Sequence, residues 1–192
     1  MSTTAFDPSA LARDLLHCFR NQKDLADRAL AQLSDAAFLA PGAGAVDPIA
    51  ITVKHVGGNL RSRWRDFLTT DGEKPDRHRD TEFELAAGES RADVTALWEA
   101  GWAEVLGTLE GLAPADWTAT VTIRGEPHSV AQAALRSLAH TSYHVGQIVQ
   151  SAKAAAGDAW HTLSIPRHGS EAFRIRPAQY LDGPKDDPGS HA

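Results

Sequence analysis

Apolar residues recur at intervals of three and four in four long segments of this chain. The segments cover residues 9–33, 48–70, 90–110 and 129–156. This spacing places side chains on one face of an α-helix, and helices of this kind bury their apolar faces against one another. The pattern therefore predicts an all-α fold, with the helices packed antiparallel-fashion as a four-helix bundle.

The segments between the predicted helices contain turn signals and one stretch that favours strands. A P-G-A-G-A run at 41–45 predicts a loop, and the polar residues 71–89 predict a second, longer one. Threonine and β-branched residues at 117–128 predict a short β-hairpin before the last helix. After residue 157 we expect an irregular C-terminal extension whose aromatics pack on the bundle. We expect one domain over residues 1–176 and a disordered tail over 177–192, which is rich in Pro, Gly and Asp.

The second and fourth predicted helices each carry a strip of neutral polar side chains. The strips contain His55, Asn59 and Ser62 in one helix and Ser137, His140, His144 and Gln147 in the other. Burying such strips is costly unless their polar groups are paired or bind something. If the two strips face each other, their three histidines converge.

His140 and His144 are four residues apart, so they lie one turn apart on the same face of a helix. Joined by His55, they would offer three neutral imidazoles to one divalent metal ion and leave coordination positions open. A metal in such a site lowers the pKa of a bound water or thiol toward neutrality, which yields a nucleophile.

Five further residues are candidates for supporting roles at this site. Asn59, Tyr143 and Gln147 are candidates for holding the outer nitrogens of the histidines, with ordinary helix–helix hydrogen bonding as the alternative. Glu82 and Glu84 are candidates for a catalytic base that reaches in from the loop at 71–89, although most of that loop is expected to lie on the surface.

Several other classes of protein are disfavoured by the sequence. The residues between His140 and His144 include no Glu, so the pair is not an H-E-x-x-H zincin motif, and no phosphate-binding loop or G-x-S-x-G elbow is present. The net charge of -6 gives no electrostatic case for binding nucleic acid or an anionic membrane. The single Cys18 excludes an intrachain disulfide, and we expect it to be a packing residue. We see no signal peptide or transmembrane stretch and expect a cytoplasmic protein.

The lone His55 is combined in this chain with the run R-S-L-A-H-T-S-Y-H-V-G-Q-I at 136–148. In these residues the chain resembles the DinB/YfiT-like metalloenzyme superfamily and, more closely, its DUF1572 branch. The T-L-S-I-P-R run at 162–167 and the S-E-A-F run at 170–173 also look like that branch.

This resemblance implies a bundle with up-down-down-up topology that often forms a homodimer. It implies a divalent metal, typically nickel or zinc, held by histidines at the positions of His55, His140 and His144. Some relatives use low-molecular-weight thiols such as bacillithiol or mycothiol. His168 stands where the branch is expected to have a small residue, so we consider it as a fourth ligand or a proton shuttle, against the alternative of a solvated loop residue.

The sequence thus favours a metal-dependent enzyme, a thiol S-transferase or a hydrolase acting on a small molecule. The metal is expected to be nickel or zinc, with iron or manganese as alternatives, because three imidazoles accept all four. Two other interpretations stay open. One is a non-catalytic metal- or ligand-binding module, and the other is a structural homodimer whose histidines are polar core residues.

Overall fold

The computed structural model describes residues 8–42, 44 and 46–175. It is mostly helical, with one small antiparallel hairpin. The α-helices are α1 (Pro8–Leu30), α2 (Asp35–Leu39), α3 (Ile49–Trp64), α4 (Arg91–Gly111), α5 (Val130–Ala156) and α6 (Ser170–Ile175). The 3₁₀ helices are η1 (Arg79–Phe83), η2 (Pro114–Thr118) and η3 (Gly157–Ala159), and the strands are β1 (Thr120–Ile123) and β2 (Glu126–Ser129). The predicted tail at 177–192 lies outside the described residues.

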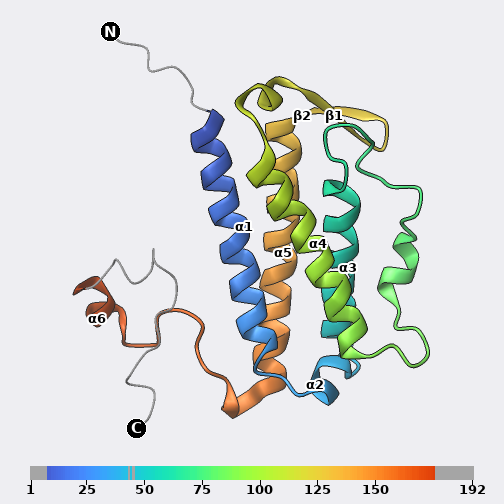
Figure 1. Cartoon of the computed structure of the whole chain (residues 1–192). Helices are drawn as coiled ribbons and strands as arrows, with labels where there is room; N and C mark the ends of the chain where they lie inside the picture. Colours follow the sequence, from blue (N-terminus) through green and yellow to red (C-terminus); the bar gives the residue numbers. More distant parts are fainter. Residues whose placement is uncertain (1–7, 43, 45, 176–192) are drawn as a thin grey trace.

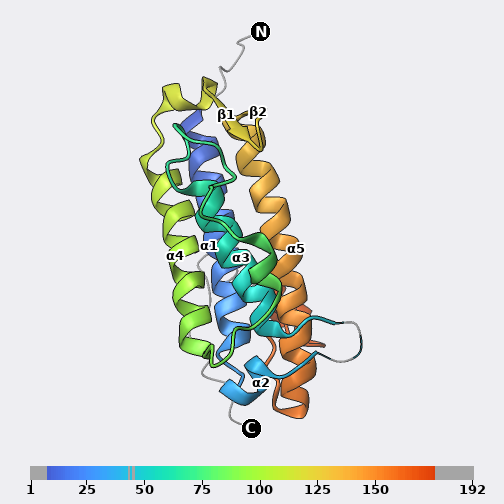
Figure 2. The ribbon, with the colours of Figure 1, turned by 90° about the vertical axis from the view of Figure 1, so that its right-hand side faces the viewer.

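The four long helices α1, α3, α4 and α5 lie side by side (Figures 1 and 2). α1 and α5 run in one direction, and α3 and α4 run in the other (Figure 1). α3 contacts both α4 and α5, and α1 contacts the same two helices. The apolar faces predicted by the three- and four-residue spacing are therefore the faces that meet.

The centre of the molecule is built from aromatic side chains of three helices. Phe19 of α1 packs edge-on against Trp64 of α3, with ring centroids 5.7 Å apart, and against Trp102 of α4 at 6.3 Å. These three side chains are almost completely buried. Edge-to-face pairs of this kind add to the stabilisation that comes from burying the rings themselves.

α3 and α4 approach each other closely because glycines face each other across the contact. A Cβ atom on Gly57 would stand 2.8 Å from the carbonyl oxygen of Leu97, and one on Gly101 would collide with the backbone of Gly57. Gly57 and Gly101 thus permit the close approach of the two backbones. Gly146 of α5 has no such role, since nothing lies within 4 Å of a Cβ placed there.

The α3 helix ends at Trp64, earlier than the expected residue 70. Residues 65–69 form turns, and Asp66 has a positive φ of 49°, which is incompatible with a continuing helix. The apolar spacing nevertheless continues through Phe67, because this side chain stacks on Trp64 with ring centroids 4.6 Å apart. Phe67 thus packs in the core although it lies outside the helix, and for this reason the apolar spacing predicted an end of α3 that is too late.

The predicted hairpin is present as β1 and β2, which pair antiparallel. It is tied to the start of the long α3–α4 connection by Asp71, whose carboxylate accepts hydrogen bonds from the backbone N–H groups of Arg124 and Gly125 at 2.8 Å each. Gly72 N–H also donates to the carbonyl of Thr122. The hairpin and the connection therefore form one layer over the end of α3.

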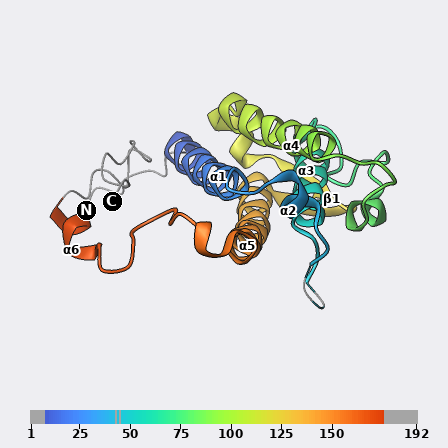
Figure 3. The same cartoon turned by 90° about the horizontal axis from the view of Figure 1, so that it is seen from below.

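Residues near the start of the C-terminal extension contact the helices. Trp160 and Leu163 are partly buried against the core, and Gln32 exchanges hydrogen bonds with the backbone of His161. α6 stands apart from the long helices (Figures 1 and 3). Among the described residues, no helix is long and apolar enough to cross a membrane.

Candidate metal centre

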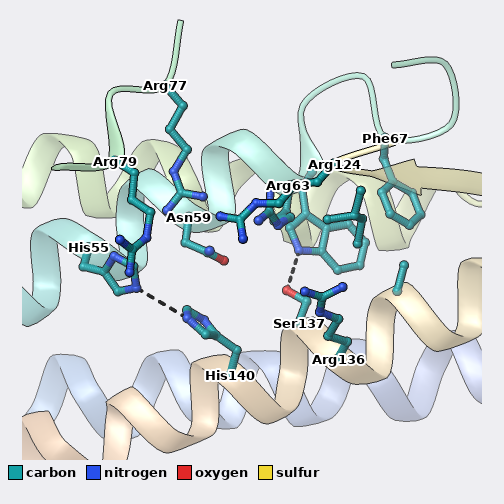
Figure 4. Close-up of a pocket in the computed structure, with 13 residues that line it drawn as sticks. His55, Asn59, Arg63, Phe67, Arg77, Arg79, Arg124, Arg136, Ser137 and His140 are labelled. Carbon is teal, nitrogen blue, oxygen red and sulfur yellow. Dashed lines mark hydrogen bonds between the residues drawn. The ribbon is translucent and has the colours of Figure 1, made fainter. Parts of the chain in front are cut away.

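His55, His140 and His144 converge between α3 and α5. One ring nitrogen from each can be chosen so that all three lie within 4.8 Å of one another. His55 Nε2 lies 3.4 Å from His140 Nε2 (Figure 4). Two imidazole nitrogens bound tetrahedrally to one zinc ion, at bonds of about 2.0–2.1 Å, stand about 3.4 Å apart. This pair therefore already has the separation that a shared ion requires.

Glu82 and Arg77 hold His55 in place. His55 Nδ1 lies 2.8 Å from Glu82 Oε2, and the guanidinium of Arg77 donates to both oxygens of the same carboxylate at 2.8 and 2.9 Å. Burial raises the pKa of Glu82, but the hydrogen bonds from Arg77 and His55 outweigh it and leave this pKa below its ordinary value. An ionised carboxylate only accepts, so the proton of His55 is on Nδ1 and the lone pair of Nε2 faces the other histidines.

Gly58 makes room for that carboxylate. A Cβ atom at this position would collide with Oε1 of Glu82. The absence of a side chain at Gly58 therefore lets the side chain of Glu82 approach α3 closely.

His144 is held by two of the residues proposed from sequence. Its Nδ1 lies 2.7 Å from Gln147 Oε1, and Gln147 Nε2 donates to the Tyr143 hydroxyl at 3.2 Å. With the amide in this orientation, the proton of His144 is on Nδ1 and the lone pair of Nε2 is available. In both His144 and His55, Nε2 is therefore the ring nitrogen that can bind a metal ion.

His140 lacks a partner of this kind. Its Nδ1 is buried and has no hydrogen-bond partner in the described part of the chain. Burial, together with the charges of His144, His55 and Arg77, lowers the pKa of His140 to about 4. Burial also lowers the pKa of His144, against an opposing hydrogen bond from Gln147. Both rings are therefore neutral at pH 7, which is the state in which histidine binds metal.

The donor set fits a divalent ion. Three ring nitrogens are brought together. Two belong to rings whose Nδ1 is held by an acceptor, and the third ring has a buried Nδ1 without a hydrogen-bond partner among the described residues. Without an ion, the contact between His55 Nε2 and His140 Nε2 is a hydrogen bond, which a cation bound to both nitrogens would replace. His55, His140 and His144 are the residues that would hold it.

A cavity of about 200 Å³ opens beside this centre, with His55 and His140 in its wall. Arginine side chains from α3, the α3–α4 connection, the hairpin and α5 line it, and Figure 4 shows them around one space. These residues are Arg63, Arg77, Arg79, Arg124 and Arg136. A small molecule in the cavity would lie against the histidines.

Other residues singled out from sequence lie as follows. Asn59 is buried and lines the cavity, but no hydrogen bond joins it to the histidines among the described residues. Glu84 is exposed, and only its backbone carbonyl is used, as an acceptor for Lys54. His168 is exposed and is not part of the histidine group. Cys18 is exposed, so the expectation that it packs in the core is wrong.

Sequence reasoning proposed Glu82 but missed Arg77, and it did not predict the buried ion pair between the two residues. Arg77 and Glu82 are both nearly inaccessible, with side-chain exposures of 4% and 7%, although they belong to a stretch expected to lie mostly on the surface. The separation of five residues between them carries no recognisable spacing rule. The fold of the connection, which the sequence does not reveal, places this ion pair against α3.

The family model described as a protein of unknown function, DUF1572, matches residues 10–169. The match spans α1 to the residues before α6, and the chain belongs to this family. Comparison with curated proteins and with solved structures finds no match.

Proposed function

We propose that this DUF1572 protein binds one divalent metal ion through His55, His140 and His144 and acts on a small molecule that enters the adjoining cavity. The observation that carries the proposal is the convergence of three imidazole nitrogens, two of them oriented by Glu82 and Gln147. Outer hydrogen bonds of this kind are the usual support of metal-bound histidines.

The direction of the helices supports a wider relationship. Two long helices running one way and two the other, with α3 and α4 parallel, is the up-down-down-up order of the DinB/YfiT-like four-helix bundle (Figure 1). We therefore propose that the chain is a member of that superfamily. On this proposal, the three histidines correspond to the nickel- or zinc-binding positions that the resemblance implies.

A bound divalent metal supplies a Lewis acid that lowers the pKa of a water or low-molecular-weight thiol. The protein's own residues orient the site: Glu82 fixes the ring of His55, Gln147 fixes the ring of His144, and helix packing buries Nδ1 of His140. The reaction we infer is a thiol S-transfer or a hydrolysis. Because Glu82 is already bonded to Arg77 and His55, its role in this scheme is to orient His55 rather than to remove a proton.

Metal analysis of protein purified without an affinity tag tests the binding. We expect about one nickel or zinc ion per chain, lost in His144→Ala and retained in His17→Ala, which changes an exposed histidine of α1. Trace metal that is unchanged by His144→Ala would refute the site and leave the histidines as polar residues of the core.

Turnover separates an enzyme from a binding module. Metal-loaded protein is incubated with a low-molecular-weight thiol and a panel of electrophiles, and separately with ester and amide substrates. We expect thiol adduct or hydrolysis product that depends on metal and disappears in His144→Ala. A metal-replete protein that turns over none of these compounds would instead be a metal-binding module without catalysis.

A further inference from the structure

The cavity beside the histidines has a positive lining in a protein that is acidic as a whole. Its wall contains five guanidinium groups, whereas the net charge of the chain is -6. Clustering like charges around one space costs free energy, and the cost is recovered when an opposite charge enters. A positive cavity in an acidic chain therefore points to a ligand with negative charge.

Two carboxylates neutralise part of this lining. Glu73 accepts hydrogen bonds from Arg63 at 3.0 Å and from Arg124 at 2.9 Å. Glu82 is held by Arg77 at 2.8 Å. These two acids serve three arginines, so the positive charge on this side of the cavity exceeds the negative charge.

Arg79 and Arg136 add charge with little compensation. Arg79 lies over the ring of Phe83, 4.7 Å from its centroid, and its nearest carboxylate is the fully exposed Asp80 at 4.0 Å. Arg136 pairs with no carboxylate in the described residues. An exposed pair at 4.0 Å contributes almost nothing, so both guanidinium groups keep their charge for a ligand.

The position of Arg136 is set by a neutral partner. His128 is buried, and its Nδ1 lies 2.9 Å from the carbonyl oxygen of Glu126, so Nδ1 carries the proton. Its Nε2 then accepts from Arg136 Nη1 at 3.0 Å. His128 thus fixes the guanidinium of Arg136 at the cavity wall without cancelling its charge. The remaining N–H groups of Arg136 can donate to a ligand.

The opposite end of the cavity is apolar. Trp64, Phe67 and Ile123 line it, and Figure 4 shows Phe67 far from the histidine pair. A volume of about 200 Å³ holds roughly 13–20 water-sized groups, taking about 10–15 Å³ for each. The occupant is therefore small, with a hydrocarbon part as well as a charged one.

We propose that the cavity binds a small organic oxyanion, a carboxylate or phosphate, with its charged group on Arg136 and the facing arginines of the α3 side. Guanidinium groups bind both oxyanions in the same two-bonded geometry. The inference rests on the proposed function for the fate of this molecule, since the histidine centre next to it would carry out the chemistry. The binding itself needs no metal, because the arginines are separate from the histidines.

Calorimetric titration of metal-stripped protein tests the proposal. The probes are glutarate, phenyl phosphate and inorganic phosphate at fixed ionic strength, with uncharged glutaramide as the matched ligand control. We expect at least one oxyanion to bind saturably and glutaramide not to bind. A carboxylate ligand is indicated if glutarate binds more tightly than both phosphates, and a phosphate ligand if the order is reversed.

The matched variants are Arg136→Gln and Arg20→Gln. Arg20 is an exposed arginine of α1 outside the cavity wall, so Arg20→Gln removes the same charge elsewhere. We expect Arg136→Gln to weaken oxyanion binding about tenfold or more, as for loss of a charged hydrogen bond, and Arg20→Gln to leave it unchanged. Circular dichroism of both variants checks the fold, which an exposed side chain on α5 does not determine.

Three results would overturn the inference: no saturable binding of any oxyanion up to about 10 mM, unaltered binding in Arg136→Gln, or equal weakening in both variants. Loss of metal binding with intact oxyanion binding would refute the proposed function alone. Intact metal binding with no effect of Arg136→Gln would refute the oxyanion site alone.

Discussion

Glu82 has two structural roles, because it orients His55 and also anchors the α3–α4 connection through Arg77. Its carboxylate is shared between His55 on α3 and Arg77 in the connection, and all three side chains are almost fully buried. Removing one partner from a buried charged network leaves the other unsatisfied. Both the geometry of His55 and the position of the connection depend on this one side chain.

We expect Glu82→Gln to reduce metal affinity by about tenfold or more, because a neutral amide holds the Nδ1 proton of His55 less strongly. Competition with a zinc-binding dye measures the change. Glu84→Gln is the control, since the side chain of Glu84 is exposed and changes no contact of the site. Equal affinities in the two variants would mean that Glu82 is not a support of the metal centre.

At the scale of single residues, helical spacing was sufficient to find the three histidines. His140 and His144 share a helix face by their separation, and His55 was assigned by the matching polar strip around Asn59. Glu82 and Glu84 remained equivalent in sequence, because which one turns inward depends on η1, a short 3₁₀ helix without a periodic signature. Glu82 is the residue that turns inward, because its carboxylate fits into the space left by the missing side chain of Gly58.

At the scale of elements, the hairpin is fixed to the α3–α4 connection mainly by Asp71. Its carboxylate accepts from the backbone N–H groups of Glu73, Arg124 and Gly125 at 2.7–2.8 Å. Burial raises the pKa of Asp71, but these hydrogen bonds outweigh it and hold the pKa well below its ordinary range. Arg124 reaches the cavity wall from this turn, so the same carboxylate also positions part of the lining.

We expect Asp71→Asn to lower the free energy of unfolding at pH 7 by about 1–2 kcal/mol. Because the folded-state pKa is depressed, this contribution is complete above the unfolded value of 3.8 and is lost as pH falls from there toward the folded pKa. The difference between wild type and variant therefore narrows below about pH 4. Denaturant unfolding at pH 7 and at pH 3 measures it.

The matched control is Asp158→Asn, which changes an exposed aspartate of η3. It is expected to leave unfolding at both pH values close to that of wild type. If Asp71→Asn behaves in the same way as this control, the carboxylate does not hold the two segments together.

Most of the helices and strands could be predicted from the sequence, but the end of α3 and the arginine lining of the cavity could not. The helices and the hairpin followed from spacing and turn residues, and the capping box of Ser90 and Asp93 is present at the start of α4. The end of α3 did not follow, because Phe67 continues the apolar spacing after the backbone has left the helix. The arginine lining did not follow either, since its members come from four separate segments.

For the whole molecule, the buried histidines make the metal-free protein sensitive to acid. Burial lowers the pKa of His140 to about 4, whereas the unfolded chain takes up this proton at the ordinary value of 6.5. The stability that goes with a neutral His140 is complete above pH 6.5 and is lost as pH falls from 6.5 toward 4. His144, whose pKa is also lowered, contributes in the same direction.

We therefore expect the melting temperature of metal-stripped protein to fall between pH 7 and pH 4.5, and to fall less steeply in His140→Gln. Thermal unfolding followed by circular dichroism across this range provides the measurement. His17→Gln, on the exposed face of α1, should follow the wild-type curve. Parallel curves for wild type and His140→Gln would show that this ring titrates normally.

The parallel course of α3 and α4 determines where several residues of the cavity and of the histidine support come from. Two neighbouring helices that run in the same direction cannot be joined by a tight turn, so the chain must travel back along the full length of α3 before α4 begins. That return path, residues 65–90, is imposed by the topology before any chemistry is selected. Arg77, Arg79 and Glu82 all lie on it, so substitutions on this return path would change the cavity wall and the support of His55 without altering the helices that carry the three histidines.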